Sequence, residues 1–212
     1  IEFVRTLGDI SLKTGTPVKD PAALLKKYDA VIVAAGVDKQ IKLGIEGENR
    51  GVEGLEYLRN CGKYKVKGKT VAVIGGGAVA ADCAMKALEL GAAKAEIFTR
   101  KNTGDIQLPE HELRDILKSG VNINAKSRIT AINKDGGINL VRLDEKARDI
   151  RGTEQTRGDI DFVILAIKNL PVFENPGRKG LFLAGDCRNG AATVVESAAS
   201  GKNAAMEADA FL

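Results

Sequence analysis

Short apolar runs alternate along this chain with segments in which apolar or small residues recur at helical spacing. The apolar runs predict buried strands at 30–34, 70–74, 95–99, 121–124, 161–167 and 181–186. The helical spacing predicts helices at 21–27, near 55–60, about 78–90, near 110–118 and at 193–211. Strands that alternate with helices are typical of a parallel sheet covered by helices. The sequence therefore predicts the α/β fold class.

Two stretches depart from this alternation. Residues 37–69 are rich in glycine and charged residues, which predicts loops. Residues 128–165 alternate between apolar and polar positions, and Gly136-Gly137 marks a turn among them. Such alternation is typical of antiparallel strands with one buried face. We therefore expect an antiparallel segment within the otherwise parallel α/β pattern.

Three of the predicted strands end in small residues. These endings are Ala34-Ala35-Gly36, Ile74-Gly75-Gly76 and Ala184-Gly185-Asp186. In open α/β sheets, ligands bind at the carboxyl ends of the strands. The strand ends are therefore the expected ligand sites.

The second of these endings begins a dinucleotide-binding pattern. The residues Gly75-Gly76-Gly77-Ala78-Val79-Ala80 fit G-x-G-x-x-A, with a strand before them and a helix after them. Gly75 would allow the tight turn, Gly77 would let the backbone approach a pyrophosphate, and Ala80 would keep the helix close to the sheet. The N–H groups and the dipole at the helix start would attract phosphate. Residues 75–80 are therefore predicted to bind a dinucleotide in a Rossmann-like domain.

The end of the next strand bears on the choice between NAD and NADP. NAD-binding sites place a carboxylate at this tip, whereas NADP-binding sites place arginine there to meet the 2′-phosphate. Glu96 opens the predicted strand, so the tip is Thr99-Arg100-Lys101, which has no carboxylate. The pattern favours NADPH, with Arg100 as the principal contact and Lys101 as a second one. The alternative is that Arg100 and Lys101 are only a solvated surface pair.

The order of these motifs, with the tail that runs from Thr193-Val194-Val195-Glu196-Ser197 to Lys202, resembles one family. It is the FAD- and NADPH-dependent pyridine nucleotide oxidoreductases of the glutamate synthase small subunit and dihydropyrimidine dehydrogenase type. In that family a Rossmann-like NADPH-binding domain is inserted into an FAD-binding domain. The resemblance implies that 68–168 is the NADPH-binding domain, and that 1–67 and 169–212 are parts of the FAD-binding domain.

The resemblance also implies where FAD would bind. Ala35 and Gly36 would belong to this site, and Gly185 and Asp186 would lie at the ribityl and phosphate region. An ionised Asp186 carboxylate could accept hydrogen bonds from hydroxyl groups. The start of the last helix, near Ala192 and Thr193, would face the flavin ring.

The activity that the resemblance implies is hydride transfer from NADPH to FAD, followed by electron transfer to a partner subunit or an iron–sulfur domain. No residue stands out as an acid–base catalyst, which suits a reaction carried by cofactors. The competing interpretation is a dinucleotide-binding or electron-transfer interaction module with no turnover of its own.

The sequence departs from the family in several places. A second G-x-G-x-x-G ahead of residue 75 is absent, and Ile167-Lys168 stands where the family usually has glycine. The segment from there to Leu181 is short, and iron–sulfur motifs are absent. Because the chain also begins without methionine, we expect it to be a fragment.

Composition and charge limit the kinds of partner and the location that the chain could have. The 212 residues carry a net charge of only +4, with acidic and basic residues interspersed, which argues against nucleic acid as a partner. No apolar run is long enough to predict a membrane span. The three cysteines are far apart, which excludes a C-x-x-C redox pair or a zinc site and suits a cytoplasmic protein. The single histidine, His111, is expected to be an exposed helix residue, and Cys83 to be a packing residue.

Overall fold

The computed structural model describes the whole chain except residues 1–2, 4–5, 107 and 175–176. The chain divides into two compact units. Unit 1 comprises Ile1–Asp38 and Leu170–Leu212, and unit 2 comprises Lys39–Asn169. The chain thus leaves unit 1 once and returns to it, so that unit 2 is inserted within unit 1.

The centre of unit 2 is a parallel five-stranded sheet. Its strand order is β3-β10-β4-β5-β6. The strands are β3 (Val52–Glu53), β4 (Thr70–Ile74), β5 (Lys94–Phe98), β6 (Asn122–Asn124) and β10 (Phe162–Leu165). Because all five strands are parallel, their carboxyl ends lie along one edge of the sheet.

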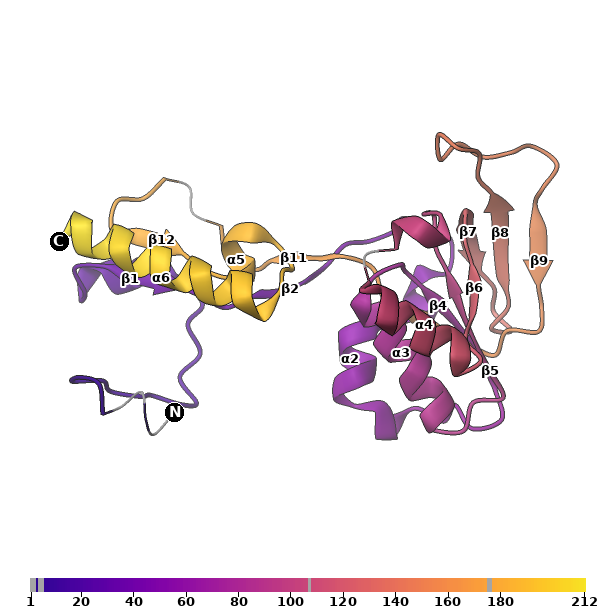
Figure 1. The fold of residues 1–212 in the computed structure, drawn as a ribbon, viewed down its shortest axis with the longest axis horizontal. Coiled ribbons are helices and arrows are strands. Elements are labelled where there is room, and N and C mark those ends of the chain that lie inside the picture. Colours follow the sequence, from indigo (N-terminus) through magenta and orange to yellow (C-terminus); the bar gives the residue numbers. More distant parts are fainter. Residues whose placement is uncertain (1–2, 4–5, 107, 175–176) are drawn as a thin grey trace. The chain divides into compact units, whose positions relative to one another are not determined.

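Helices cover one face of this sheet (Figure 1). They are α2 (Gly54–Arg59), α3 (Ala78–Glu89) and α4 (Glu110–Lys118), and short 3₁₀ turns lie at Glu48–Arg50, Cys61–Lys63 and Thr103–Asp105. The core beneath them is built from small residues of α3 and branched residues of the strands. Tyr57, Tyr64 and Phe162 form an aromatic cluster at its margin, with ring centroids 5.6 to 6.1 Å apart. The small residues of α3 allow the helix to lie close to the sheet.

A three-stranded antiparallel sheet covers the other face. Its strands are β7 (Ser127–Ile132), β8 (Ile138–Arg142) and β9 (Gln155–Arg157), in the order β7-β8-β9. Its apolar side chains share a second core with residues of β4, β5 and β10. The antiparallel segment and its turn are confirmed: Gly136 adopts φ 99° between β7 and β8. The antiparallel part ends at β9, and β10 joins the parallel sheet.

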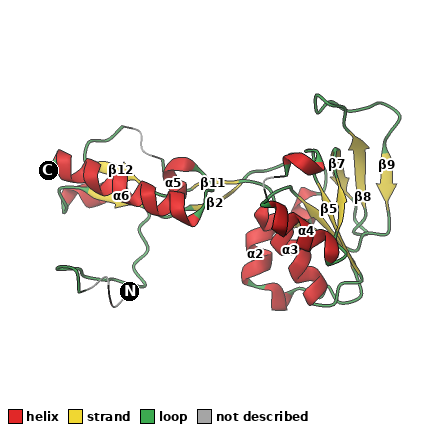
Figure 2. Cartoon of the chain, in the orientation of Figure 1, coloured by secondary structure: helices red, strands yellow, loops and turns green. Residues whose placement is uncertain are grey.

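Unit 1 is smaller and has a small core. β1 (Val31–Val33) pairs in parallel with β12 (Leu181–Leu183), and α6 (Val194–Phe211) packs on both strands (Figure 2). Unit 1 also contains α5 (Asp186–Asn189) and a 3₁₀ helix at Pro21–Lys26. Asp20, the N-cap of this 3₁₀ helix, accepts a hydrogen bond from the N–H of Ala22 at 3.0 Å. The helix expected at 21–27 therefore forms, but it is a 3₁₀ helix.

A two-stranded ladder contains both boundaries between the units. It is formed by β2 (Val37–Gln40) and β11 (Asn169–Pro171). The division at 38/39 differs from the domain boundary expected at 67/68. Residues 39–67 belong to unit 2 because β3 pairs with β10 and Tyr57 of α2 is fully buried in the unit 2 core. The second boundary, at 169/170, lies within one residue of the one expected.

Candidate dinucleotide-binding site

The turn after β4 is packed between the ends of two neighbouring strands. The N–H of Gly75 donates to the carbonyl of Phe98 at 3.0 Å. A Cβ on Gly75 would lie 2.2 Å from the carbonyl oxygen of Ala166, and one on Gly76 would lie 2.3 Å from Thr99 Oγ1. A Cβ on Gly75 would force the backbone of Ala166 to move, and one on Gly76 would displace the side chain of Thr99.

Gly77 faces open space instead. A Cβ built on it meets nothing within 4 Å. Gly77 is the N-cap of α3, and among the described residues no side chain caps this end of the helix. The N–H of Ala80 donates to the carbonyl of Gly77 at 3.0 Å, so the N–H groups of Ala78 and Val79 are the ones left for an external acceptor, as the G-x-G-x-x-A pattern predicts.

The next residues fix the helix on the sheet. Ala78 is exposed, whereas Ala80 is fully buried, 3.2 Å from where a Cβ of Gly75 would lie. Val79 packs towards Gly54 at the start of α2. The expectation that the small residue Ala80 keeps the helix close is therefore consistent with its burial.

The tip of β5 is also held firmly. Thr99 is buried, its N–H donates to the carbonyl of Asn124 at 3.1 Å, and its Oγ1 accepts from the N–H of Lys101 at 3.2 Å. Arg100 and Lys101 are exposed. The tip therefore presents two cations, Arg100 and Lys101, beside the glycine turn. Thr99 joins the tip to the turn because its side chain packs against Gly76.

Glu96 lies away from this edge, in the middle of β5. Only 2% of it is exposed, and its carboxylate accepts hydrogen bonds from Lys94 at 2.7 Å, Arg157 at 2.7 Å and Asn124 at 2.9 Å. Burial alone would raise the pKa of Glu96, but the hydrogen bonds from Arg157, Lys94 and Asn124 lower the pKa to about 2. Its carboxylate is fully occupied inside unit 2, so it does not supply the acidic tip of an NAD site.

The candidate residues of unit 1 lie at the ends of its two strands. Gly36 and Gly185 adopt left-handed conformations, with φ 71° and 61°, that favour glycine. The thiol of Cys187 donates to the carbonyl of Gly36 at 3.2 Å, and the N–H of Gly185 donates to Ser200 Oγ at 3.0 Å. The ends of β1 and β12 are thereby tied to each other and to α6, and Ala35 beside them is exposed.

Asp186 shapes the loop that leads into α6. Its Oδ1 accepts from the N–H of Ala192 at 3.2 Å and from Ser197 Oγ at 3.1 Å. Thr193 then caps α6 in a reciprocal box with Glu196. The side chain of Glu196 thereby has a capping role.

The structure thus gathers the predicted residues into two groups. Residues 75–80 and 99–101 meet in unit 2, and 35–36, 185–186 and 192–193 gather in unit 1. Sequence reasoning missed Ala166, whose carbonyl fills the space beside Gly75. The signal for it was the predicted strand 161–167, which had to end at the same sheet edge.

Other expectations can be compared with the structure. His111 is exposed on α4, Cys83 is fully buried in α3, and all three cysteines are free thiols. Among the described residues, no group of histidine, cysteine and acidic side chains could hold a metal ion. Within the same part of the chain, none of the helices has the length and apolar character needed to span a bilayer.

Comparisons with known proteins agree with this geometry. Residues 12–167 match the family model described as pyridine nucleotide-disulphide oxidoreductase. The chain is 30% identical to the NADP(+)-dependent formate dehydrogenase subunit beta of Moorella thermoacetica, over all of this chain and 36% of that protein. It is 27% identical to the glutamate synthase [NADPH] small chain of Azospirillum brasilense, over 89% of this chain and 50% of that protein. The chain therefore spans half or less of the length of these relatives.

Solved structures show the same fold. Thioredoxin reductase of T. acidophilum superposes on 86% of this chain and 66% of its own, with a TM-score of 0.65 and 21% identity. The thioredoxin reductase of Lactococcus lactis gives the same TM-score at 20% identity, over 86% of this chain and 65% of its own. The predicted Rossmann-like α/β class is confirmed. The family match, which covers most of the chain, confirms the resemblance found in its motifs: the chain belongs to the pyridine nucleotide-disulphide oxidoreductase family.

Proposed function

We propose that this chain binds NADPH in unit 2 and FAD in unit 1, as part of an oxidoreductase that passes electrons to a partner subunit or an iron–sulfur domain. One observation carries the proposal. The uncapped start of α3, left open at Gly77, lies beside a strand tip that carries Arg100 and Lys101. A phosphate-bearing dinucleotide suits both features.

The start of α3 fits a pyrophosphate. Gly77 leaves room for a phosphate group to approach the backbone, and the free N–H groups of the first turn would donate to its oxygens. Gly75 and Gly76 hold the turn in place through contacts with Ala166 and Thr99. These residues bind and orient the nucleotide.

The tip of β5 favours NADPH over NADH. Exposed Arg100 and Lys101 would contact a 2′-phosphate. The tip itself has no carboxylate, and the carboxylate of Glu96 is paired with Arg157 within unit 2, so neither would repel the phosphate. The names of two relatives agree, since the formate dehydrogenase beta subunit is NADP(+)-dependent and the glutamate synthase small chain is an NADPH enzyme.

Unit 1 fits part of a flavin site. Gly36 and Gly185 lie at two adjacent strand ends with positive φ, a Cβ on Gly36 would meet nothing within 4 Å, and Asp186 follows Gly185 as a hydrogen-bond acceptor. Val194 and Val195, after the N-cap of α6, are 87% and 77% exposed and offer an apolar surface to a ring. A flavin supplies hydride uptake and release of single electrons when bound. The residues of this chain would bind and orient it.

The electron acceptor is proposed to lie on another subunit or domain. The formate dehydrogenase relative is named as a beta subunit and the glutamate synthase relative as a small chain, so both belong to larger assemblies. We propose the glutamate synthase small-subunit type of assembly. Three free cysteines suit a cytoplasmic location.

The nucleotide part is tested by titrating the chain with NADPH and with NADH, followed by nicotinamide fluorescence. We expect tighter binding of NADPH, and we expect Arg100→Ala to remove this preference while NADH binding stays the same. Arg114→Ala is the matched control because Arg114 lies on α4 and pairs with a helix neighbour, Glu110. Equal affinity for both nucleotides would contradict the assignment to NADPH.

The flavin part is tested by adding FAD to the chain and then NADPH without oxygen. Bleaching of the flavin absorbance is expected for the enzyme, whereas the competing interaction module would bind nucleotide and leave flavin oxidised. Asp186→Ala should weaken FAD binding and leave NADPH binding intact. Loss of both together would indicate misfolding, which circular dichroism would detect.

A further inference from the structure

The ends of β5 and β6 are joined backbone to backbone at the proposed nucleotide edge. β6 runs parallel to β5, so the turn that follows β6 emerges beside the tip of β5. In this turn the N–H of Lys126 donates to the carbonyl of Lys101 at 3.1 Å, and the N–H of Ser127 donates to the carbonyl of Thr99 at 2.9 Å. The backbone of Lys126 is therefore bonded directly to that of Lys101, one of the two cations of the tip.

The backbone of Lys126 has a conformation that is unusual for a residue with a side chain. Its φ is 49°, and it is one of two non-glycine residues with positive φ in the part of the chain that the structure describes. Glycine and asparagine adopt this region readily, whereas lysine rarely does. A strained residue of this kind that persists beside a ligand edge points to a role for its side chain.

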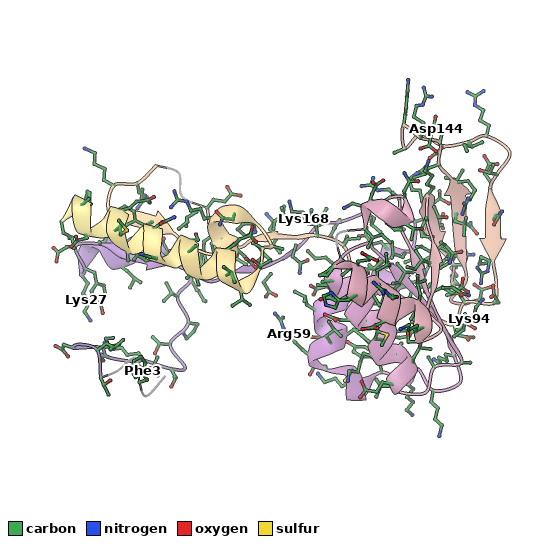
Figure 3. The ribbon with its side chains drawn as sticks, viewed as in Figure 1. Phe3, Lys27, Arg59, Lys94, Asp144 and Lys168 are labelled. Carbon is green, nitrogen blue, oxygen red and sulfur yellow. The ribbon has the colours of Figure 1, made fainter. Side chains whose placement is uncertain are left out.

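The ammonium group of Lys126 is already held by a counterion. It forms an ion pair with Glu145, in the loop that follows β8. The lysine side chain is only 17% exposed, whereas that of Glu145 is 85% exposed. The N–H of Leu143 donates to the carbonyl of Lys126 at 2.9 Å, which fixes the start of this loop. Figure 3 marks Asp144 in the same loop. The lysine is thus fixed, and its partner is free to turn into solvent.

We propose that Lys126 is a third cation for the 2′-phosphate of NADPH, and that Glu145 neutralises Lys126 until the nucleotide binds. The inference rests on the proposed NADPH site and adds to it a specificity-determining residue from the next strand end. A phosphate dianion attracts an ammonium group more strongly than a single carboxylate does, so it displaces Glu145. Arg142, the nearby arginine, is already engaged with Ser127 Oγ at 3.0 Å.

Removing the charge of Lys126 and removing that of Glu145 should have opposite effects on the affinity for NADPH. Loss of the Lys126 ammonium removes attraction for the 2′-phosphate. Loss of the Glu145 charge removes a competitor for the same ammonium group. NADH has no 2′-phosphate, so neither change should affect its affinity. A merely structural role of the pair would not produce this pattern.

The experiment is the NADPH and NADH titration of the chain with paired variants. Lys126→Gln should weaken NADPH binding about threefold to tenfold, and Glu145→Gln should strengthen it about twofold to fivefold, with NADH unchanged in both. Lys126→Gly should weaken NADPH binding similarly while it relieves the left-handed strain, which separates loss of charge from misfolding. Lys134→Gln is the matched control, because Lys134 is an exposed lysine beyond the other end of β7.

The outcomes separate the two proposals. If Arg100→Ala lowers NADPH affinity and Lys126→Gln does not, the role of Lys126 is refuted and the NADPH site stands. If Lys126→Gln weakens NADPH and NADH equally, Lys126 does not recognise the 2′-phosphate. If the unmodified chain shows no preference for NADPH, the proposed site fails, and the role of Lys126 fails with it.

Discussion

Glu96→Gln tests the buried charge cluster that joins the two sheets of unit 2. Glu96 is on β5 of the parallel sheet, and its partner Arg157 is on β9 of the antiparallel sheet. Arg157 also pairs with Asp159 at 2.7 Å, and Lys94 pairs with Glu96 at 2.7 Å. The substitution keeps the shape of Glu96 but removes the negative charge that holds two cations.

The expected loss follows from the pKa of Glu96. The pKa falls from an ordinary value of 4.5 to about 2 in the folded chain. A difference of this size corresponds to roughly 3 kcal/mol in the free energy of unfolding, since one pKa unit is about 1.4 kcal/mol. Removing one partner of a buried ion pair costs about 3–5 kcal/mol, which is similar. We expect Glu96→Gln to lower the free energy of unfolding of unit 2 by about 3 kcal/mol.

Urea unfolding followed by tyrosine signals measures this loss. The chain has no tryptophan, and two of its three tyrosines, Tyr57 and Tyr64, lie in the aromatic cluster of unit 2. Glu89→Gln is the matched control. Glu89 is 67% exposed and pairs with Lys86 on the same helix, so its loss should cost less than about 0.5 kcal/mol.

The pH dependence has a defined sign. Because the folded pKa lies below the unfolded one, the ionised carboxylate stabilises the fold fully above about pH 4.5, and this contribution is lost as the pH falls towards 2. The difference between wild type and Glu96→Gln should therefore be full at pH 7 and shrink below 4.5. A difference under about 0.5 kcal/mol at pH 7, or one that does not change with pH, would refute the reasoning. A loss of NADH binding in the variant would instead place Glu96 in the nucleotide site.

Three further results are expected. Gly77→Ala should leave the fold intact and weaken NADPH binding in a titration, whereas Gly75→Ala should also destabilise the fold by about 1–3 kcal/mol in urea, because of these two positions Gly75 is the one that lacks space for a Cβ; equal stability losses would count against this distinction. Thr193→Ala should cost about 1 kcal/mol and speed amide exchange in the first turn of α6, since the cap is lost; unchanged exchange would rule out a stabilising cap. A thiol reagent should modify partly exposed Cys61 in the native chain and reach Cys83 only after unfolding, because burial raises the pKa of Cys83 to about 12; rapid modification of Cys83 would disagree with the packed α3.

Local signals explain what the sequence predicted well. β4 and α3 were predicted because branched residues at 70–74 precede a glycine turn and a run of small residues at helical spacing. The structure shows similarly local features at Asp20, which caps the 3₁₀ helix at Pro21–Lys26, and at Gly91, which has φ 86° just after α3. Each of these features is encoded within a single turn or strand.

The features that were missed depend on distant partners. β3 has only two residues and is defined by its pairing with β10, more than a hundred residues later. This pairing places residues 39–67 in unit 2, which is why the structural division at 38/39 differs from the boundary expected at 67/68. The ion pair of Glu96 with Arg157 joins residues 61 positions apart, and the local sequence around either residue does not predict the other. Spacing rules could state only that Glu96 was misplaced for a ribose contact.

The proposed nucleotide site combines both kinds of information. The residues of each strand end follow from the local sequence, but the proposed site also depends on Gly76, which has no side chain and lets Thr99 pack against the turn. The turn and the tip are therefore one packed surface, and Lys126 extends it by a backbone hydrogen bond to Lys101. Within this arrangement the pyrophosphate and the 2′-phosphate would be bound by adjoining strand ends of a single sheet. Any substitution that separates Thr99 from Gly76 should thus weaken recognition of both phosphates together, although neither residue carries a charge.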